Sequence, residues 1–141
     1  INTLTKYYFS DIGLRNAILD MRQQEETHIM ENIIYNELVR RGYSVDVGVV
    51  TSYEKDSQGK TVRKVREIDF VVNRSGERVY IQSAYAIQTE EKRLAELKPF
   101  SFTGDSFRKV VVRKDVGRRW FDERGVLNIS VYDFLLDPSA I

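Results

Sequence analysis

The middle of the chain reads Val65-Arg66-Glu67-Ile68-Asp69-Phe70-Val71-Val72, then Arg74-Ser75-Gly76-Glu77, then Val79-Tyr80-Ile81-Gln82-Ser83-Ala84-Tyr85. The outer two stretches are rich in β-branched and aromatic residues, which favour strands. The Ser-Gly pair between them is typical of a tight turn. The sequence therefore predicts a β-hairpin at this point, and the rest of the fold is arranged around it.

Two polar residues interrupt the apolar pattern of this hairpin. Strict alternation places Ile68, Phe70 and Val72 on one face of the sheet and Asp69 on the other. Asp is disfavoured in the middle of a strand, so Asp69 requires an explanation. Gln82 on the partner strand can lie beside it. The alternative is that Asp69 is a solvated strand residue and Gln82 an ordinary cross-strand partner.

The flanking sequence predicts helices before and after the hairpin and further strands on both sides. Helices are predicted over 11–21, 24–41, 90–98 and 131–136, strands over 44–50, 65–73, 79–87, 107–113 and 126–129, an extended segment over 6–9, and a polar hairpin tip over 53–64. No repeat or linker divides the chain, so we expect a single domain over residues 1–141. This order predicts an α/β fold in which helices flank a mixed sheet.

The long helix over 24–41 carries two carboxylates in or beside its apolar stripe. Helical spacing places Glu31 near Leu38, and Glu37 between Ile33 and Met30. An unpaired buried carboxylate is costly, so each residue requires a hydrogen bond, a cation or a metal. If this helix covers the hairpin, Glu31 joins Asp69 and Gln82. The alternative is pairing with a neighbouring arginine or a backbone amide.

Composition excludes several classes of protein. The 141 residues contain no cysteine and one histidine, His28, which excludes disulfide scaffolds, thiolate nucleophiles and multi-histidine metal sites. Twenty-two Lys and Arg oppose 21 Asp and Glu, so no large uniform basic field exists. No apolar run is long enough for a membrane span, and the lack of cysteine fits a reducing compartment. We expect a cytoplasmic protein without a membrane partner.

Four motifs carry a family resemblance. They are Lys6-Tyr7-Tyr8-Phe9-Ser10-Asp11-Ile12-Gly13-Leu14-Arg15-Asn16, Met30-Glu31-Asn32-Ile33-Ile34-Tyr35-Asn36-Glu37-Leu38 with Arg41-Gly42-Tyr43, Glu67-Ile68-Asp69-Phe70-Val71, and Tyr80-Ile81-Gln82-Ser83-Ala84-Tyr85. In this order they resemble the C-terminal domain, formerly of unknown function, that follows AAA-type ATPase modules in bacteria and archaea, within the PD-(D/E)XK nuclease superfamily. The resemblance covers nearly the whole chain.

The resemblance implies a restriction-endonuclease-like core and an N-terminal ATPase module as its partner. The sequence does not begin with Met, so we expect a C-terminal fragment of a longer ATPase. ATP is expected only on that module, because no G-x-x-x-x-G-K-[ST] phosphate-binding loop occurs in this chain. We expect no cofactor on this fragment.

The resemblance also assigns a nuclease-like site. The helix carboxylate falls on Glu31 and the strand carboxylate on Asp69, which would be the ligands of any Mg²⁺. The acid-x-Lys element falls on Gln82-Ser83-Ala84, so an amide replaces a carboxylate and Ala84 stands in the lysine slot. Loss of both groups predicts a degenerate site. Lys92 or Lys98 could replace the missing cation only by reaching in from the following helix.

Two groups of residues are candidates for a nucleic-acid face. One is Arg63, Lys64 and Arg66 near the hairpin tip; the other is Arg113, Lys114, Arg118 and Arg119 around Trp120. Cations beside an aromatic ring suit phosphate contact and base stacking. The alternative for the second group is a solvated loop whose Trp120-Phe121 pair packs in the core.

Three hypotheses follow from the sequence. The first is a catalytically degenerate nuclease-like domain that acts as an interaction or regulatory module of an ATPase. The second is an active Mg²⁺-dependent DNA nuclease, and the third is a DNA-binding module without cleavage.

Overall fold

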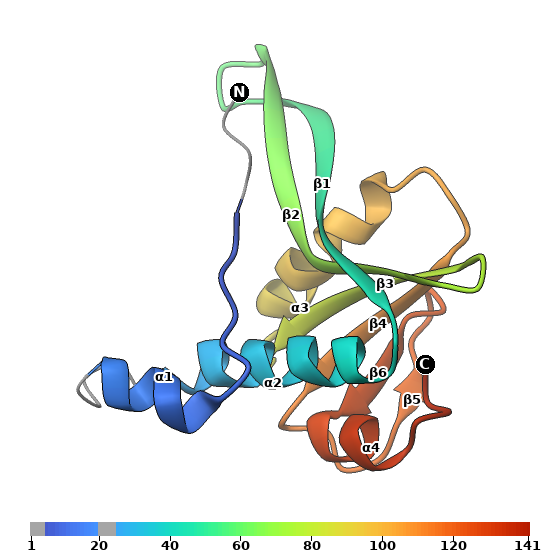
Figure 1. Ribbon diagram of the computed structural model, residues 1–141. Helices are drawn as coiled ribbons and strands as arrows, with labels where there is room; N and C mark the ends of the chain where they lie inside the picture. The colour runs from blue at the N-terminus through green and yellow to red at the C-terminus, as the bar shows by residue number, and fades with distance from the viewer. Residues whose placement is uncertain (1–4, 20–24) are drawn as a thin grey trace.

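The computed structural model describes residues 5–19 and 25–141. Its elements are α1 (Ile12–Ile18), α2 (Glu26–Arg40), β1 (Ser44–Lys55), β2 (Thr61–Arg74), β3 (Glu77–Ala84), α3 (Glu90–Leu97), η1 (Lys98–Phe102), β4 (Arg108–Arg113), β5 (Trp120–Phe121), β6 (Leu127–Ser130) and α4 (Val131–Leu136). Figure 1 shows helices on both sides of the sheet. The Met21 end of the predicted first helix lies outside the described residues.

The strands form one mixed sheet in the order β1-β2-β3-β4-β6-β5. The β1–β2, β2–β3 and β5–β6 pairs are antiparallel, whereas β3–β4 and β4–β6 are parallel. The predicted hairpin at Ser75-Gly76 is present, and both residues have positive φ. The parallel strands β3 and β4 are connected by a crossover that contains α3 and η1. The predicted mixed sheet flanked by helices is thus confirmed.

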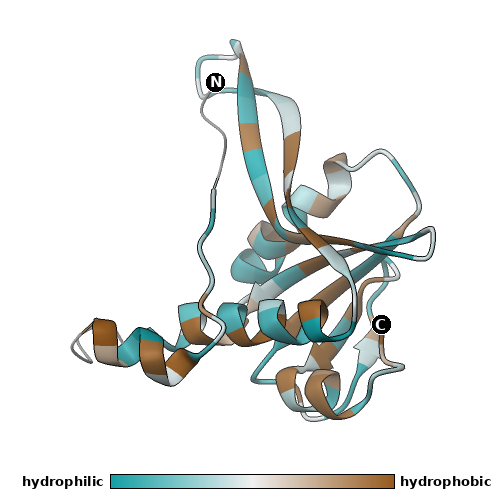
Figure 2. Cartoon of the chain, viewed as in Figure 1, coloured by the Kyte–Doolittle hydropathy of each residue, from teal (hydrophilic) through white to brown (hydrophobic). Residues whose placement is uncertain are grey.

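Two apolar layers enclose the sheet. Met30, Ile34 and Leu38 of α2 pack with α4 against one face, and Leu97 of α3 packs with Phe100 of η1 against the other. Strand β4 serves both layers because its successive valines point to opposite faces. Figure 2 shows the apolar segments gathered on the central strands and on α4.

Strict alternation is wrong at the start of the predicted hairpin. Ile68 packs in the layer beneath α3, whereas Phe70 packs in the layer beneath α2 together with Val72. The cause is a register shift in the β1–β2 pairing between Asp46 and Gly48. A bulge of this kind rotates the strand, so residues on either side of it change faces relative to a simple count of two.

The β1–β2 hairpin is longer than predicted. The strands continue through most of the segment expected to form a polar tip, and only 56–60 turn. The carboxylate of Asp56 closes this turn by accepting hydrogen bonds from the backbone N–H groups of Gln58 and Lys60, both at 2.9 Å. Figure 1 shows this ribbon extending beyond α2, with η1 beside it.

The segment around Trp120 also differs from expectation. Trp120 and Phe121 form the short edge strand β5, and their side chains are 44% and 62% exposed. The interpretation that they pack in the core is therefore wrong. The apolar layer beneath α2 is filled in this region by residues of β6 and α4, such as Leu127 and Phe134. No helix in the described part of the chain has the length and apolar character to cross a membrane.

Candidate functional site

An extended N-terminal segment, residues 5–10, lies across α2, and we call it the strap. The backbone N–H of Phe9 donates to Oδ1 of Asn32 at 3.0 Å, and Nδ2 of Asn32 donates back to the Phe9 carbonyl at 2.7 Å. The Tyr8 ring stacks on Tyr35 with centroids 4.2 Å apart and planes 15° from parallel. The predicted extension over 6–9 is thus docked on the helix without joining the sheet.

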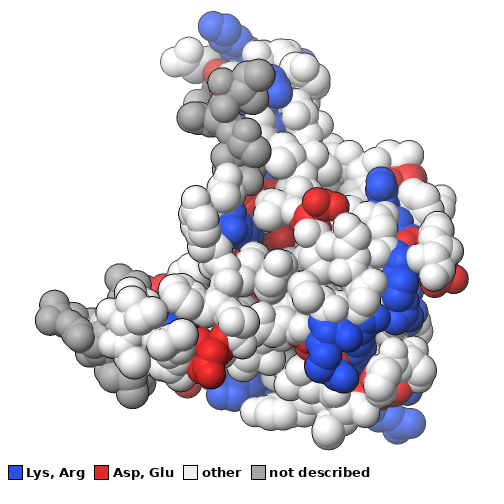
Figure 3. All heavy atoms as spheres, viewed as in Figure 1, with Lys and Arg blue, Asp and Glu red and all other residues white. Residues whose placement is uncertain are grey.

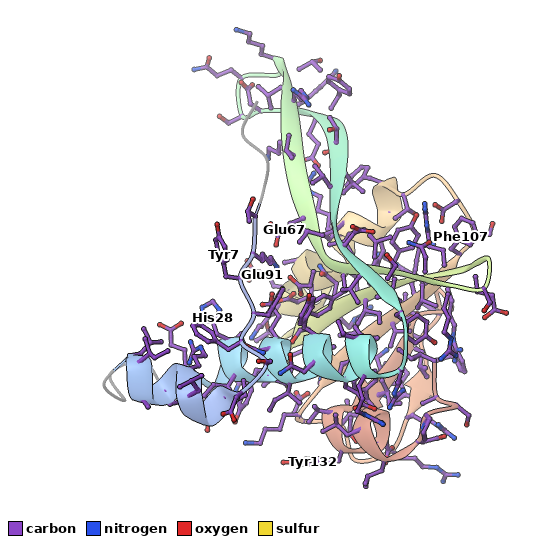
Figure 4. The ribbon with its side chains drawn as sticks, in the orientation of Figure 1. Tyr7, His28, Glu67, Glu91, Phe107 and Tyr132 are labelled. Carbon is purple, nitrogen blue, oxygen red and sulfur yellow. The ribbon has the colours of Figure 1, made fainter. Side chains whose placement is uncertain are left out.

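The strap carries Lys6 to three carboxylates, which we call the acidic cluster: Glu31 of α2 with Glu67 and Asp69 of β2. The Lys6 Nζ lies 2.9 Å from Oε1 of Glu31 and 3.0 Å from Oδ1 of Asp69, and it also forms an ion pair with Glu67. Figure 4 shows Glu67 where β2 passes the strap. One ammonium group therefore joins the helix and the strand that sequence reasoning placed together.

Tyr8 provides a second strap contact to the same helix carboxylate. Its phenol O–H donates to Oε1 of Glu31 at 2.6 Å. Burial raises the pKa of Tyr8 well above its ordinary value, and the hydrogen bond to Glu31 adds to the shift. The phenol is therefore protonated at neutral pH and donates this hydrogen bond.

The charge state of Lys6 is set by two opposing effects. Burial lowers its pKa, but the hydrogen bonds to Glu67 and Glu31 and the charge of Asp69 together raise the pKa above the ordinary value of 10.5. Lys6 is therefore an ammonium at neutral pH. The ammonium offsets the free-energy cost of desolvating these carboxylates, which would lack a cation without it.

Asp69 and Gln82 are neighbours, but the amide does not face the acidic cluster. Oε1 of Gln82 accepts the backbone N–H of Asp69 at 2.8 Å, and Nε2 donates to the Glu96 carbonyl at 3.3 Å. The second carboxylate oxygen of Asp69 accepts the backbone N–H of Ser83 at 2.9 Å. Gln82 is buried and joins β2 and β3 to α3.

The Asp69 carboxyl lies in a site that disfavours its ionised form. Burial raises its pKa; the Ser83 N–H and Lys6 lower it, and the charge of Glu31 raises it further. Glu96, on the other side of the strand pair, has a pKa raised by burial and then by the charge of Asp69. Glu96 is thus a fourth carboxyl close to the site.

The position of the missing lysine is filled by apolar packing. Ala84 is 3% exposed and lies in the layer with Ile68 and Leu97. Lys92 is exposed on α3, and the Nζ of Lys98 pairs with Glu54 at 3.3 Å. The cation comes instead from Lys6, which sequence reasoning missed along with Glu67 and Glu96.

A usable signal for Lys6 was present in the sequence. Several carboxylates expected in one place require a cation, and Lys6 opens the first of the four motifs. Nothing in local periodicity gives the distance between Lys6 and Asp69, which are 63 residues apart. That contact depends on where the strap crosses α2.

The arrangement does not fit a bound Mg²⁺. Mg²⁺ requires several oxygen ligands in near-octahedral geometry. Oxygens of Glu31 and Asp69 that would supply them already face the Lys6 ammonium, and the Gln82 oxygen is engaged by a backbone N–H. Within residues 5–19 and 25–141 no group of three or more Asp, Glu or His side chains is placed to hold a metal ion.

The remaining polar residues of α2 have ordinary partners. Glu37 pairs with Arg40 and Arg41, each with an N–O distance of 2.6 Å, as the alternative for this residue predicted. The Arg40 hydrogen bond lowers the pKa of Glu37. His28 is exposed in the first turn, with Nε2 2.8 Å from a Glu25 oxygen, and contacts none of the acidic cluster.

The candidate nucleic-acid residues occupy opposite edges of the sheet. Arg63, Lys64 and Arg66 lie on β2 beside the edge strand β1, whereas Trp120 begins β5 at the other edge, directly after Arg118 and Arg119. The structure does not bring these two groups together, so they cannot form one continuous surface.

Within each group some cations are already paired. Arg66 pairs with Glu54, Lys64 lies 3.4 Å from the same carboxylate, and Arg119 lies 2.7 Å from Asp137. Arg113 is buried and pairs with Asp115, so the prediction that it lies on a nucleic-acid face is wrong. The other candidates form two separate sets, and only part of each set is available to a partner.

Comparison with known proteins identifies one matching family. The model described as "Domain of unknown function (DUF4143)" matches residues 26–132. A curated relative from Haemophilus influenzae, named "Uncharacterized protein", is 30% identical over 142 residues. The alignment covers 96% of this chain and 30% of the relative. No solved structure matches, and the strap lies outside the residues matched by the family model.

Proposed function

We propose, from the premise that the chain belongs to the family of the domain of unknown function DUF4143, that it is a nuclease-like domain without cleavage chemistry. In this proposal it acts as an interaction or regulatory module of a longer AAA-type ATPase. The restriction-endonuclease-like character of the core is part of the proposal. It is supported by a mixed sheet with helices on both faces and by the motif order.

The position of Lys6 is the observation that carries this proposal. Its ammonium occupies the space between Glu31 and Asp69, at 2.9 and 3.0 Å from their oxygens. A divalent cation at that point would meet a fixed positive charge, because Lys6 remains protonated at neutral pH. The carboxylates serve to hold the strap in place.

The strand that would supply the remaining chemistry supports the same conclusion. Gln82 contributes a hydrogen bond between strands, and Ala84 contributes apolar packing. General acid–base help is commonly worth about 10²–10⁴-fold in rate, and no side chain at position 84 can provide it here.

The proposed ATPase partner is supported by the length of the Haemophilus influenzae relative. The chain spans 30% of that protein, which leaves most of its length to other parts. The chain itself carries no phosphate-binding loop, so nucleotide binding is assigned to the remainder. A regulatory role predicts that deleting this domain from the full-length protein changes its ATPase rate. An unchanged rate would contradict that role.

A plasmid-cleavage assay tests the loss of chemistry. The chain is incubated with supercoiled plasmid and Mg²⁺ or Mn²⁺, alongside Glu31→Gln, Asp69→Asn and, as a matched loss of charge, Glu91→Gln on the exposed face of α3. No cleavage is expected from any of them. Cleavage that persists in Glu91→Gln and disappears in the two cluster variants would overturn the proposal.

One observation favours the second candidate, an active Mg²⁺-dependent DNA nuclease. Lys6 places an ammonium 3.0 Å from Asp69, so the strap could stand in for the absent strand lysine. In that case Lys6→Ala would abolish cleavage in the same assay. If the first proposal holds, neither the wild-type chain nor Lys6→Ala cleaves.

A further inference from the structure

The outer part of the β1–β2 hairpin presents one supported face and one open face. We call residues 49–66 the arm. Figure 1 shows the arm standing clear of the helices, with η1 near its base. The two faces carry different side chains because successive residues of each strand point in opposite directions.

The supported face is held by a network centred on Glu54. This carboxylate pairs with Arg66 across the arm and lies 3.3 Å from Nζ of Lys98, the first residue of η1. The Arg66 guanidinium lies 5.1 Å from the centre of the Phe102 ring. These contacts brace the arm against the body, so a partner would bind a largely preformed surface.

The open face pairs exposed residues of the two strands. Tyr53 lies opposite Arg63, and Thr51 lies opposite Val65. Tyr53 is 71% exposed and Val65 is 52% exposed. The full set on this face is Val49, Thr51, Tyr53, Lys55, Thr61, Arg63 and Val65, all exposed.

Positive charge is concentrated in the arm. Residues 52–66 contain five Lys and Arg against two carboxylates, in a chain whose net charge is only +1. The two carboxylates are used internally, since Glu54 serves the supported face and Asp56 accepts backbone N–H groups of the turn. Figure 3 shows Lys and Arg atoms at the free end of the arm.

Three of these cations have no ion-pair partner among the described residues: Lys55, Lys60 and Arg63. Lys55 and Arg63 lie on the open face, and Lys60 lies in the turn. Cations that are exposed and unpaired within one small region favour a polyanion as the partner, because phosphates supply the charge that the described residues do not.

We propose that the open face of the arm binds duplex nucleic acid by entering its major groove. A two-stranded β-ribbon has the dimensions that this groove admits. Lys55, Lys60 and Arg63 would contact phosphates on the groove walls, and Tyr53 would lie against the bases or sugars. Duplex nucleic acid would then be the partner of the proposed interaction module. The inference rests on the proposed function in one respect, that binding is not followed by cleavage.

The acidic cluster at the foot of the open face has a negative charge that Lys6 offsets in part. Glu67 pairs with Val49 at the foot of the open face, where a bare carboxylate would repel phosphate. Lys6 forms an ion pair with Glu67 and hydrogen bonds to Glu31 and Asp69. The strap therefore reduces the negative field at the point where the arm meets the body.

The test measures duplex binding and its salt dependence. Fluorescence anisotropy of a labelled duplex of about 20 base pairs is recorded with the full chain from about 50 to 200 mM salt. The arm variant is Lys55→Gln with Arg63→Gln. The matched control, Lys92→Gln with Arg124→Gln, removes the same charge from exposed positions outside the arm and outside the group around Trp120.

The arm variant is expected to weaken duplex binding about tenfold or more at low salt. The slope of log affinity against log salt becomes less negative by about 2, one unit for each lost phosphate contact. The control pair changes the affinity less than about twofold. Thermal unfolding of each variant confirms that these surface changes leave the fold intact.

Three results would overturn the proposal: no duplex binding even at low salt, equal weakening by the arm and control pairs, or binding only to single strands. Tyr53→Ser gives a further check. If the arm bound phosphates through its cations alone, this change would leave the duplex affinity unchanged. Entry of Tyr53 into the groove predicts a loss of duplex affinity.

The two proposals can fail separately. Plasmid cleavage together with arm-dependent duplex binding would refute the proposed loss of cleavage chemistry and leave the binding proposal standing. Absence of both duplex binding and cleavage would refute the proposal that the arm binds duplex nucleic acid and leave the proposed loss of cleavage chemistry standing.

Discussion

The Nζ of Lys6 lies 2.9 Å from Oε1 of Glu31, across 25 residues of chain. This contact joins the strap, which the family model does not match, to a helix that it does match. The same nitrogen reaches Asp69 on β2. Strap, helix and sheet are therefore connected through one positive charge, and changes at this point test how the strap is held.

Lys6→Met is expected to lower the free energy of unfolding by about 1–3 kcal/mol at pH 7, because it leaves partly buried carboxylates without their cation. Urea unfolding measures the change. Lys60→Met, at the exposed turn of the arm, is the matched control and should be nearly neutral. A Lys6→Met protein as stable as the control would show that the cluster does not depend on the ammonium.

The contribution of Lys6 should disappear at high pH. Its pKa is raised above the ordinary value of 10.5, so the folded state retains a proton that the unfolded state loses. The stabilisation is complete below about pH 10 and falls as pH rises further. The difference in unfolding free energy between wild type and Lys6→Met should therefore be flat from pH 7 to about pH 10 and then shrink. A difference that grows with pH would contradict the direction of the shift.

Asp69→Asn should change the pH dependence of stability in acid. Burial raises the pKa of Asp69 above its ordinary value of 3.8. At a pH between 3.8 and the raised pKa, the folded state therefore binds more protons than the unfolded state. The stability of wild type relative to Asp69→Asn should then fall as pH rises through this interval and level off above it. Urea unfolding in steps from about pH 3.5 to 7 measures this difference.

Asp115→Asn supplies a control of opposite sign. Hydrogen bonds from Arg113 lower the pKa of Asp115, so its contribution is present above pH 3.8 and is lost as pH falls through the lowered value. The stability of wild type relative to Asp115→Asn should therefore rise with pH below 3.8, whereas its stability relative to Asp69→Asn should fall with pH above 3.8. The urea series for Asp115→Asn is extended below about pH 3.5 to cover this interval. Parallel slopes would mean that the shifts of Asp69 and Asp115 do not have opposite directions.

Gln82→Ala should destabilise the protein although it removes no charge. The change leaves the backbone N–H of Asp69 and the carbonyl of Glu96 without their side-chain partner. An orphaned buried polar group costs about 1–3 kcal/mol. Gln58→Ala in the exposed turn of the arm is the control, and equal effects of the two changes on thermal unfolding would count against the bridging role.

Gly48→Ala tests the bulge that shifts the strand register. A Cβ at this position would lie 2.7 Å from Cγ2 of Val71 and 2.9 Å from Cβ of Ile68. Overpacking of this kind costs about 1–3 kcal/mol. Gly117→Ala, where nothing lies within 4 Å, is the matched control. If both changes are neutral in thermal unfolding, the close approach of the two strands is not required.

The sequence predicted those elements whose signals are local. The apolar stripe of α2 and the hairpin turn at Ser75-Gly76 each act within a few residues. The pairing of Glu37 with nearby arginines is equally local, because it follows from helical spacing. These features are present in the structure close to where they were predicted.

Errors arose where distant parts of the chain compete for the same space. The alternative for the group around Trp120 placed this side chain in the core, but β5 lies exposed at the sheet edge and residues of β6 and α4 pack in the apolar layer there. Ile68 changed faces because β1 imposes a register shift on β2, which no count along β2 alone can detect.

By itself, the sequence determined the helices, the turn at Ser75-Gly76 and two acids, Glu31 and Asp69, that needed a partner, since periodicity, turn chemistry and the cost of burying charge act locally. The tertiary structure alone decided that Lys6 is this partner and that Gln82 faces away from the carboxylates. The reason is physical. A side chain 63 residues away along the chain is brought within 3.0 Å of Asp69 only after the strap has docked on α2 and α2 has packed on the sheet.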